Sequence, residues 1–305
     1  MKKYLPYLSG LSFSLIFGFS FMFTKNALQT ISPFQIMGYR FLSAAILVNL
    51  LWLFGIIKIN LNFNDLKYLF YISLAQPIFY FIFETTGMNY TTSSEAGLLI
   101  SLIPVAVTIL AVFFLNEKPS KKQLFFIILS VLGVMFIIIM KGTTEIRGNF
   151  LGMALIGGAV LMAGIFNILS RKFSVNFNPE TITYFMMTIG ALVFNTILLS
   201  MDSTSFSNYF KPLLDIDILI SVLYLGVLSS VLAFFFMNFT LSKLPAAQSA
   251  VFANFVTVVS IFAGVFIRNE PFYWFQIIGA IVIIIGVWGT NYYGNIQKQE
   301  TELKG

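Results

Sequence analysis

The sequence predicts an all-α polytopic membrane protein with ten transmembrane helices, arranged as two inverted five-helix repeats. Three observations support this fold class. The 305-residue chain is 58% hydrophobic and only 10% charged, whereas soluble domains carry about 25% charged residues. Its apolar stretches are continuous and have the length, about 20 residues, that a helix needs to span a bilayer. The second half of the chain also repeats features of the first half.

The expected spans follow one another through short connections. Pro residues such as Pro33 and Pro179 mark these connections, where a helix is expected to begin or end. Because the apolar runs are continuous rather than alternating, a β-barrel is excluded. The expected spans are residues 6–27, 33–55, 67–87, 94–115, 122–140, 148–170, 179–200, 215–238, 246–267 and 272–292.

The distribution of Lys and Arg predicts the orientation in the membrane. If the N-terminus is cytoplasmic, the cytoplasmic segments carry 12 Lys and Arg residues and the external connections carry four. Such an excess of positive charge is typical of the cytoplasmic side. We therefore predict a multi-pass protein of the cell (cytoplasmic) membrane, with both termini in the cytoplasm.

Matched residues in the two halves predict an internal repeat. An odd number of spans per copy makes the copies antiparallel and places a chamber between them. Chance similarity between two apolar segments is the alternative. The matched pairs, offset by 146 or 153 residues, are Gly18 and Gly164, Lys25 and Arg171, Pro33 and Pro179, Glu117 and Glu270, Gln123 and Gln276, and Gly133 and Gly286. The predicted domains are repeat one (1–141), repeat two (142–295) and a polar cytoplasmic tail (296–305).

Several segments resemble EamA-type members of the drug/metabolite transporter superfamily. They are residues 17–21 (FGFSF), 31–34 (ISPF), 90–99 and 114–119. The resemblance covers about residues 8–140 and 148–290. It implies a ten-helix inverted-repeat carrier, often an exporter of amino acids or other small metabolites, although some relatives import. It does not identify the substrate.

Ionisable residues within membrane spans are costly to bury, which makes them functional candidates. Lys25, Arg40, Glu84 and Glu95 all fall in the outer half of the first copy and can pair with one another. For Lys25 and Arg40 we favour a structural role, in which they snorkel to the headgroups or tie helix ends together. Glu95 can equally be a helix N-terminal carboxylate, with one of the two preceding serines as the cap.

Glu84 is the sharpest candidate for a binding or coupling residue. Tyr80 lies four residues earlier and shares its helix face. A carboxylate beside an aromatic ring can hold an ammonium group, or it can be a protonation site that couples transport to protons. Pairing with Lys25 or Arg40 alone is the structural alternative.

Polar and aromatic residues near the bilayer centre complete the candidate site, because buried amides and hydroxyls need partners. Gln76-Pro77 and Ile103-Pro104 are expected to kink their spans. Glu117 and Glu270 are expected at helix ends, where they form gate contacts with nearby Lys or Arg. The candidate substrate-binding residues besides Glu84 and Tyr80 are Phe17, Ser20, Asn167, Phe252 and Asn254, with Gln76 and Asn238 as further polar candidates.

These observations predict a secondary active transporter that moves small metabolites such as amino acids by alternating access. Export is the expected direction, and proton coupling is an option. The chain has no Cys and no His, which removes thiol chemistry, Ser-His-Asp triads and His-ligated zinc, and no Walker A motif is present.

We therefore expect no enzyme activity, no catalytic residue, no metal and no cofactor. The expected partners are a small-molecule substrate and the lipid bilayer, without nucleic acid. A homodimer stays open, although no pattern in the sequence supports one. An uptake carrier for amines or other small metabolites, and a lipid flippase, are the alternative functions.

Overall fold

The computed structural model describes residues 4–59, 66–115, 120–140, 146–174, 176–201, 209–244, 249, 252–271 and 273–302. Every regular element in these ranges is a helix, as the sequence predicts. Seven of the described helical stretches are long and apolar enough to cross a membrane, and two shorter apolar helices, Ala253–Ile267 and Trp274–Thr290, accompany them. The chain is therefore a multi-pass membrane protein.

Local capping explains where helices of the first half begin. The hydroxyl of Ser32 accepts a hydrogen bond from the backbone N–H of Gln35 at 3.3 Å, and Gln35 Oε1 accepts from the N–H of Ser32 at 2.9 Å. This capping box, followed by Pro33, starts a helix by satisfying donors that a helix end leaves free. The elements of the first half are α1 (Leu5–Ala27), α2 (Pro33–Leu53), α3 (Leu66–Ser73), η2 (Leu74–Phe79), α4 (Tyr80–Asn89), α5 (Ser93–Ile100), α6 (Ile103–Leu115) and α7 (Lys121–Met140).

The described residues of the second half also form helices. One of its starts is capped by Asp215, whose carboxylate accepts from the backbone N–H of Asp217 at 2.9 Å. The elements are α8 (Ile146–Phe173), α9 (Pro179–Met201), η3 (Lys211–Leu214), α11 (Ile216–Leu223), η4 (Tyr224–Leu232), α12 (Ala233–Lys243), α14 (Ala253–Phe262), η5 (Ala263–Ile267) and α15 (Trp274–Glu302).

Two spans are interrupted where the sequence predicts kinks. Gln76 has non-helical torsions (φ −149°, ψ 119°) between α3 and α4, and the turn at residues 101–102 separates α5 from α6. A Pro follows each break and cannot donate to the preceding turn. The expected kinks at Pro77 and Pro104 are therefore confirmed.

The C-terminal end is helical over most of the segment that the sequence predicts as a polar tail, residues 296–305. Helix α15 continues to Glu302, so most of that segment extends the last helix. The physical reason is that its Gln, Lys and Glu residues are good helix formers and no Pro interrupts them. Residues 303–305 lie outside the described part of the chain.

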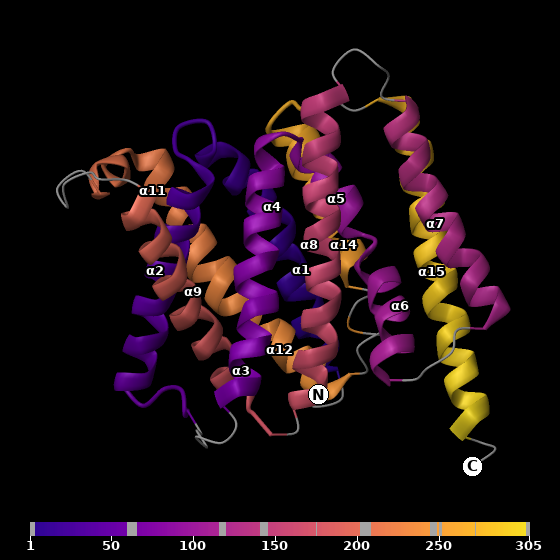
Figure 1. Ribbon diagram of the computed structural model, residues 1–305, viewed down its shortest axis with the longest axis horizontal. Coiled ribbons are helices and arrows are strands. Elements are labelled where there is room, and N and C mark those ends of the chain that lie inside the picture. The colour runs from indigo at the N-terminus through magenta and orange to yellow at the C-terminus, as the bar shows by residue number, and fades with distance from the viewer. Residues whose placement is uncertain are drawn as a thin grey trace.

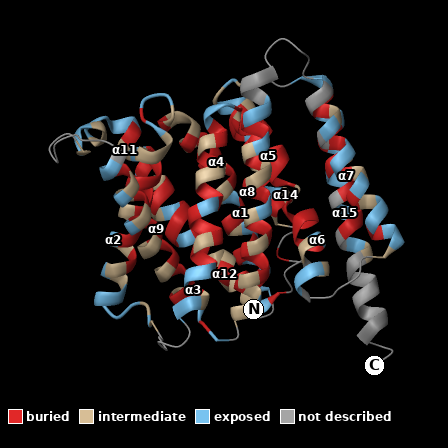
Figure 2. Cartoon of the chain, viewed as in Figure 1, coloured by how far each residue is buried: buried red, intermediate tan, exposed pale blue. Residues whose placement is uncertain are grey.

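The helices form a bundle with α1 and α8 at its centre, as Figure 1 shows. Helix α1 packs against α12, α14 and η4, whereas α8 packs against α4, α5 and α6. Buried residues concentrate on these inner helices, and exposed positions follow the outer faces of the bundle (Figure 2). Many exposed side chains are large and apolar, Leu53 and Phe113 among them, which is expected of a surface that faces lipid.

Helices α7 and α15 lie side by side at one edge of the bundle, on the right in Figure 1. A Cβ atom at Gly133 would lie only 3.1 Å from the carbonyl oxygen of Gly279, and one at Gly286 only 2.8 Å from that of Phe126. Glycine at both positions therefore lets the two backbones approach closely, as small residues commonly do between membrane helices.

Candidate functional site

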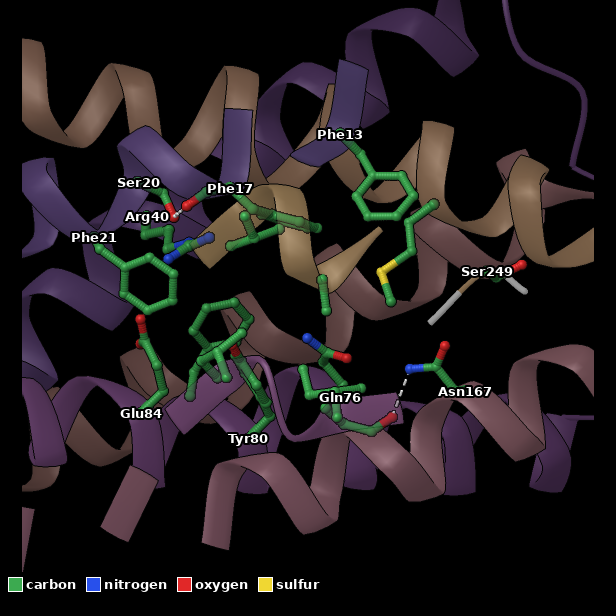
Figure 3. Close-up of a pocket in the computed structure, with 17 residues that line it drawn as sticks. Phe13, Phe17, Ser20, Phe21, Arg40, Gln76, Tyr80, Glu84, Asn167 and Ser249 are labelled. Atoms are coloured by element: carbon green, nitrogen blue, oxygen red, sulfur yellow. Dashed lines mark hydrogen bonds between the residues drawn. The ribbon is translucent and has the colours of Figure 1, made fainter. Parts of the chain in front are cut away.

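A cavity lies between helices of both halves, where about 610 Å³ is free of protein atoms, part of it open to solvent. Figure 3 shows Arg40 and Glu84 toward one end of the cavity, Gln76 in its middle, and Asn167 and Ser249 toward the other end. The lining residues are Phe13, Phe17, Ser20, Phe21, Arg40, Gln76, Tyr80, Phe81, Glu84, Ile100, Ile103, Ala163, Asn167, Met237, Ser249, Ala253 and Val256.

An aromatic stripe on α1 forms one wall of the cavity. Phe13, Phe17 and Phe21 are spaced four residues apart and therefore share one helix face. The rings of Phe13 and Phe17 meet edge to face, with their centroids 5.9 Å apart. Of these three, only Phe17 is a candidate from the sequence. Ser20 also lines the cavity, but its hydroxyl donates to the carbonyl of Phe17 at 2.7 Å.

Arg40 of α2 is buried in the bundle with only 2% of its surface exposed. Its Nε donates to Ser230 Oγ and its Nη2 to Ser229 Oγ, both at 2.7 Å. The guanidinium also lies 4.1 Å from the centroid of the Phe81 ring, which is a cation–π geometry. Arg40 therefore does not snorkel to the headgroups, and its hydrogen bonds instead tie α2 to η4.

Ser229 and Ser230 of η4 are residues that the sequence analysis missed. They lie 189 and 190 residues from Arg40 in the chain. The signal in the sequence is weak, because two adjacent serines in an apolar span are common. Their hydroxyls hold the guanidinium from the second half of the protein, so this cavity wall joins the two halves.

Glu84 of α4 is as deeply buried as Arg40, and it accepts a hydrogen bond from Thr85 Oγ1 at 2.8 Å. Tyr80, one helical turn earlier, lines the cavity beside it. Direct pairing of Glu84 with Lys25 or Arg40, the structural alternative, is not found among the described side chains. Arg40 bonds to the two serines, and Lys25 Nζ donates to the carbonyl of Met88 at 2.8 Å.

Gln76 enters the cavity because the third span is broken at this residue. Non-helical backbone within a membrane protein is tolerated where it is buried in protein or lines a cavity, and broken helices commonly form transporter binding sites. Gln76 is 4% exposed, and its Oε1 has no hydrogen-bond partner.

The opposite end of the cavity is polar but uncharged. Asn167 of α8 donates from Nδ2 to the carbonyl of Ala163 at 2.8 Å, and the buried hydroxyl of Ser249 has no partner. Asn238 does not line the cavity, since it accepts from Ser170 at 2.9 Å and donates to Thr183 at 3.0 Å.

Two other candidates fall outside the cavity lining. Phe252 packs edge to face on Phe13, with centroids 5.8 Å apart, behind the cavity wall. Asn254 is also absent from the lining, although its buried Oδ1 has no hydrogen-bond partner.

Glu270 follows η5 in the chain and bonds to the start of α5. Its carboxylate accepts from the backbone N–H groups of Ser93 and Ser94 at 3.2 Å each, at the start of α5. Arg268 lies 3.3 Å from the same carboxylate. An anion is favoured at a helix N-terminus, so Glu270 fastens the end of η5 to α5. Glu117, its expected counterpart, lies outside the described residues.

Glu95 has a local role at the same helix start. It forms a capping box with Thr92, in which the Thr92 hydroxyl accepts from the Glu95 N–H at 3.2 Å and Glu95 accepts from the Thr92 N–H at 3.3 Å. The expectation that Ser93 or Ser94 caps this helix is wrong, because the cap residue must precede the first helical turn. Glu95 does not line the cavity.

An all-helical membrane protein with a charged cavity between its two halves is typical of membrane transporters. The EamA-like transporter family matches residues 5–139 and 150–292, and the chain belongs to this family of the drug/metabolite transporter superfamily. Among the described residues, no three acidic, His or Cys side chains gather closely enough to hold a metal ion.

Individual relatives agree with this assignment. The chain is 36% identical over 295 residues to Uncharacterized transporter YcxC of Bacillus subtilis (strain 168), covering 96% of this chain and 94% of that protein. It is 31% identical over 293 residues to Uncharacterized transporter YetK of the same organism, covering 95% and 87%. A crystal structure of another protein superposes with a TM-score of 0.67 at 13% identity, covering 93% of this chain and 96% of that one, and supports the fold alone. The chain is thus related to transporters rather than to enzymes.

Proposed function

We propose that this protein is a secondary carrier that moves small zwitterionic metabolites, amino acids among them, across the cell membrane by alternating access. Export is the proposed direction. The observation that carries the proposal is a pair of opposite charges in one buried cavity. Arg40 and Glu84 both line it, yet each bonds to neutral hydroxyl groups rather than to the other.

The energetics of these two charges favour a zwitterionic ligand. Removing an ion from water costs several kcal/mol unless a partner charge or strong hydrogen bonds replace the water. A substrate carboxylate can bond to the Arg40 guanidinium, while its ammonium group lies between Glu84 and the ring of Tyr80. One ligand then compensates both charges. The aromatic stripe on α1 gives the body of the substrate an apolar wall.

Glu84 is also the proposed coupling residue. An ammonium group and a proton compete for the same carboxylate, so binding of one accompanies release of the other. Such competition produces exchange of substrate against protons, which supports export when protons flow inward. Arg40 keeps its charge in both states and anchors the carboxylate of the substrate.

The proposed architecture has ten spans in two inverted repeats, residues 1–141 and 142–295, with both termini in the cytoplasm. Equivalent hydrogen bonds in the two halves support it. Lys25 donates to the carbonyl of Met88 at 2.8 Å, and Arg171 donates to that of Leu241 at 3.0 Å. Lys25 and Arg171 are offset by 146 residues and their acceptors by 153 residues, the same offsets as the sequence repeat.

The crossing of α7 and α15 supports the same two-fold relation. Gly133 faces Gly279, and Gly286 faces Phe126. Residues 286 and 279 follow residues 133 and 126 by 153 positions each. The proposed two-fold axis therefore relates one contact to the other. Helix α1 begins and α15 ends at the same edge of the bundle, the lower one in Figure 1, as an even number of spans requires.

Glu270 is the proposed outer gate. In the proposed topology the end of the bundle at which α5 begins faces outward, so the bonds from Glu270 to Ser93 and Ser94 close the path to the cavity from that side. Alternating access then requires these bonds to break when the two halves rock apart.

Counterflow with the purified protein in liposomes tests this function. Vesicles loaded with unlabelled methionine should accumulate labelled methionine through the wild-type protein. The substitution Glu84→Gln should impair this exchange and remove its pH dependence, with little loss of folded protein, because glutamine keeps the shape of the side chain. Glu180→Gln, a carboxylate in the first turn of α9, is the matched control and should transport normally.

Wild-type exchange by the Glu84→Gln variant, with an unchanged pH profile, would remove Glu84 from the mechanism. Absence of exchange for every zwitterion, together with scrambling of a labelled lipid, would replace the carrier by a flippase.

A further inference from the structure

The carrier site described so far leaves part of the cavity unexplained. The two charges that would hold a zwitterion lie toward one end, whereas Gln76, Asn167 and Ser249 extend along the remainder (Figure 3). A headgroup bound at Arg40 and Glu84 therefore does not by itself fill this part of the cavity.

Gln76 presents an unused acceptor to that space. Its Oε1 has no hydrogen-bond partner, and the residue is only 4% exposed. Leaving a buried carbonyl group without a partner is destabilising, and such groups in native structures are rare. The break in the helix at Gln76 is what directs this amide into the cavity rather than into a helix contact.

Ser249 and Asn167 extend the polar surface beyond Gln76. The hydroxyl of Ser249 is buried and also without a partner. The amide nitrogen of Asn167 is occupied by the carbonyl of Ala163, and Figure 3 shows its oxygen turned away from that bond. Since the nitrogen is engaged, the group that Asn167 can still offer a ligand is its carbonyl oxygen, which accepts hydrogen bonds.

The chemistry of this region is polar and neutral. Arg40 and Glu84 are the charged residues of the described lining, and Figure 3 places both toward the opposite end. The remaining neighbours are apolar, such as Met237 and Ala253. A charged group would find no opposite charge there and would bear its desolvation cost, whereas an uncharged N–H or O–H donor would satisfy the free acceptors.

We infer that Gln76, Asn167 and Ser249 form a second subsite that recognises an uncharged hydrogen-bond donor on the substrate side chain. The inference rests on the proposed carrier function. The preferred substrates are zwitterions whose side chain ends in a primary amide, as in glutamine. Zwitterions of similar length with an apolar end, such as methionine, or with a charged end, such as glutamate, bind more weakly.

Competition against labelled glutamine in the liposome exchange assay tests the subsite. With the wild-type protein, unlabelled glutamine should compete about tenfold better than methionine, the difference expected from one buried acceptor left unsatisfied. In Gln76→Met this preference should shrink to about twofold, because methionine has a similar shape but offers no amide. Since the ratio compares two ligands on one preparation, a smaller yield of folded protein does not change it.

Ser73→Ala is the matched control. Its hydroxyl is also buried and without a partner, and it lies in the same span, but it does not line the cavity. This variant should keep the wild-type preference for glutamine. Equal competition by glutamine and methionine in the wild type, or an unchanged preference in Gln76→Met, would overturn the subsite while leaving the carrier intact. If no zwitterion is bound or exchanged, the proposed function itself fails.

Discussion

Replacing Glu270 by Gln should open the outer end of the bundle. The carboxylate accepts from the N–H groups of Ser93 and Ser94 at 3.2 Å and from Arg268 Nε at 3.3 Å. A hydrogen bond to a charged group contributes about 1.5–3 kcal/mol, and a carboxylate at a helix N-terminus adds about 0.3–1 kcal/mol. Because glutamine keeps one acceptor, we expect a loss of about 2 kcal/mol, or about 30-fold in the balance between closed and open outer gates.

The absence of Cys in the chain makes this change measurable with one engineered thiol. Ser20 lines the cavity, and cysteine is close to serine in size. In Ser20→Cys protein, a maleimide that does not cross the membrane reacts from outside only when the outer gate is open. Its reaction rate should therefore rise by up to about 30-fold when Glu270→Gln is added.

Asp217→Asn provides the matched control for the gate. Asp217 is exposed in the first turn of α11. The substitution therefore also removes a carboxylate near a helix start, but at a place outside the proposed gate. It should leave the reaction rate unchanged. A rate that stays the same in Glu270→Gln, or that rises equally in Asp217→Asn, would refute the gate.

The remaining predictions concern stability and the anion anchor. Replacing Ser229 and Ser230 together by Ala leaves the guanidinium of Arg40 without two hydrogen bonds. The double variant should be less stable by about 2–4 kcal/mol and should unfold at a lower temperature in detergent. Methionine should also compete more weakly for binding to it. An unchanged unfolding temperature together with unchanged competition would show that the serines do not hold the arginine. Gly133→Ala should destabilise by about 1–3 kcal/mol, because its Cβ would lie 3.1 Å from a facing carbonyl oxygen. Gly157→Ala, where the Cβ would meet nothing within 4 Å, should unfold no earlier than the wild type, and an equal loss in both variants would contradict the close crossing of α7 and α15.

The helical fold was predictable because a membrane leaves few choices. An apolar run of about 20 residues must satisfy its own backbone hydrogen bonds, and a helix does so within one segment. The breaks at Pro77 and Pro104 were predictable from local sequence, since Pro cannot donate a hydrogen bond to the preceding turn. The extension of α15 to Glu302, through the predicted polar tail, follows from residues that favour helix.

The candidate site was predictable where a residue is conspicuous in an apolar span. Phe17, Ser20, Tyr80, Glu84 and Asn167 all line the cavity. Polarity or charge within a membrane span marks most of these positions from the sequence alone. Their grouping around one cavity depends on helix packing, which the sequence alone does not determine.

Long-range partners were not predictable. Ser229 and Ser230 reach Arg40 from almost 190 residues away, and no local pattern signals that contact. Phe252 and Asn254 fall outside the cavity lining, and Phe252 packs on Phe13 instead. A rotation of one residue about a helix axis, about 100°, is enough to make that difference.

The most direct test of the central claim compares three ligands that differ only in their charges. Binding of methionine, of its analogue without the amino group and of its analogue without the carboxylate can be measured as thermal stabilisation of the purified protein. If Arg40 and Glu84 hold opposite ends of a zwitterion, methionine should stabilise the wild type most. In Glu84→Gln, the protein no longer has the carboxylate that holds the amino group of the ligand. The analogue without the amino group should therefore stabilise this variant as much as methionine does, or more. An unchanged order of the three ligands in that variant would contradict the account.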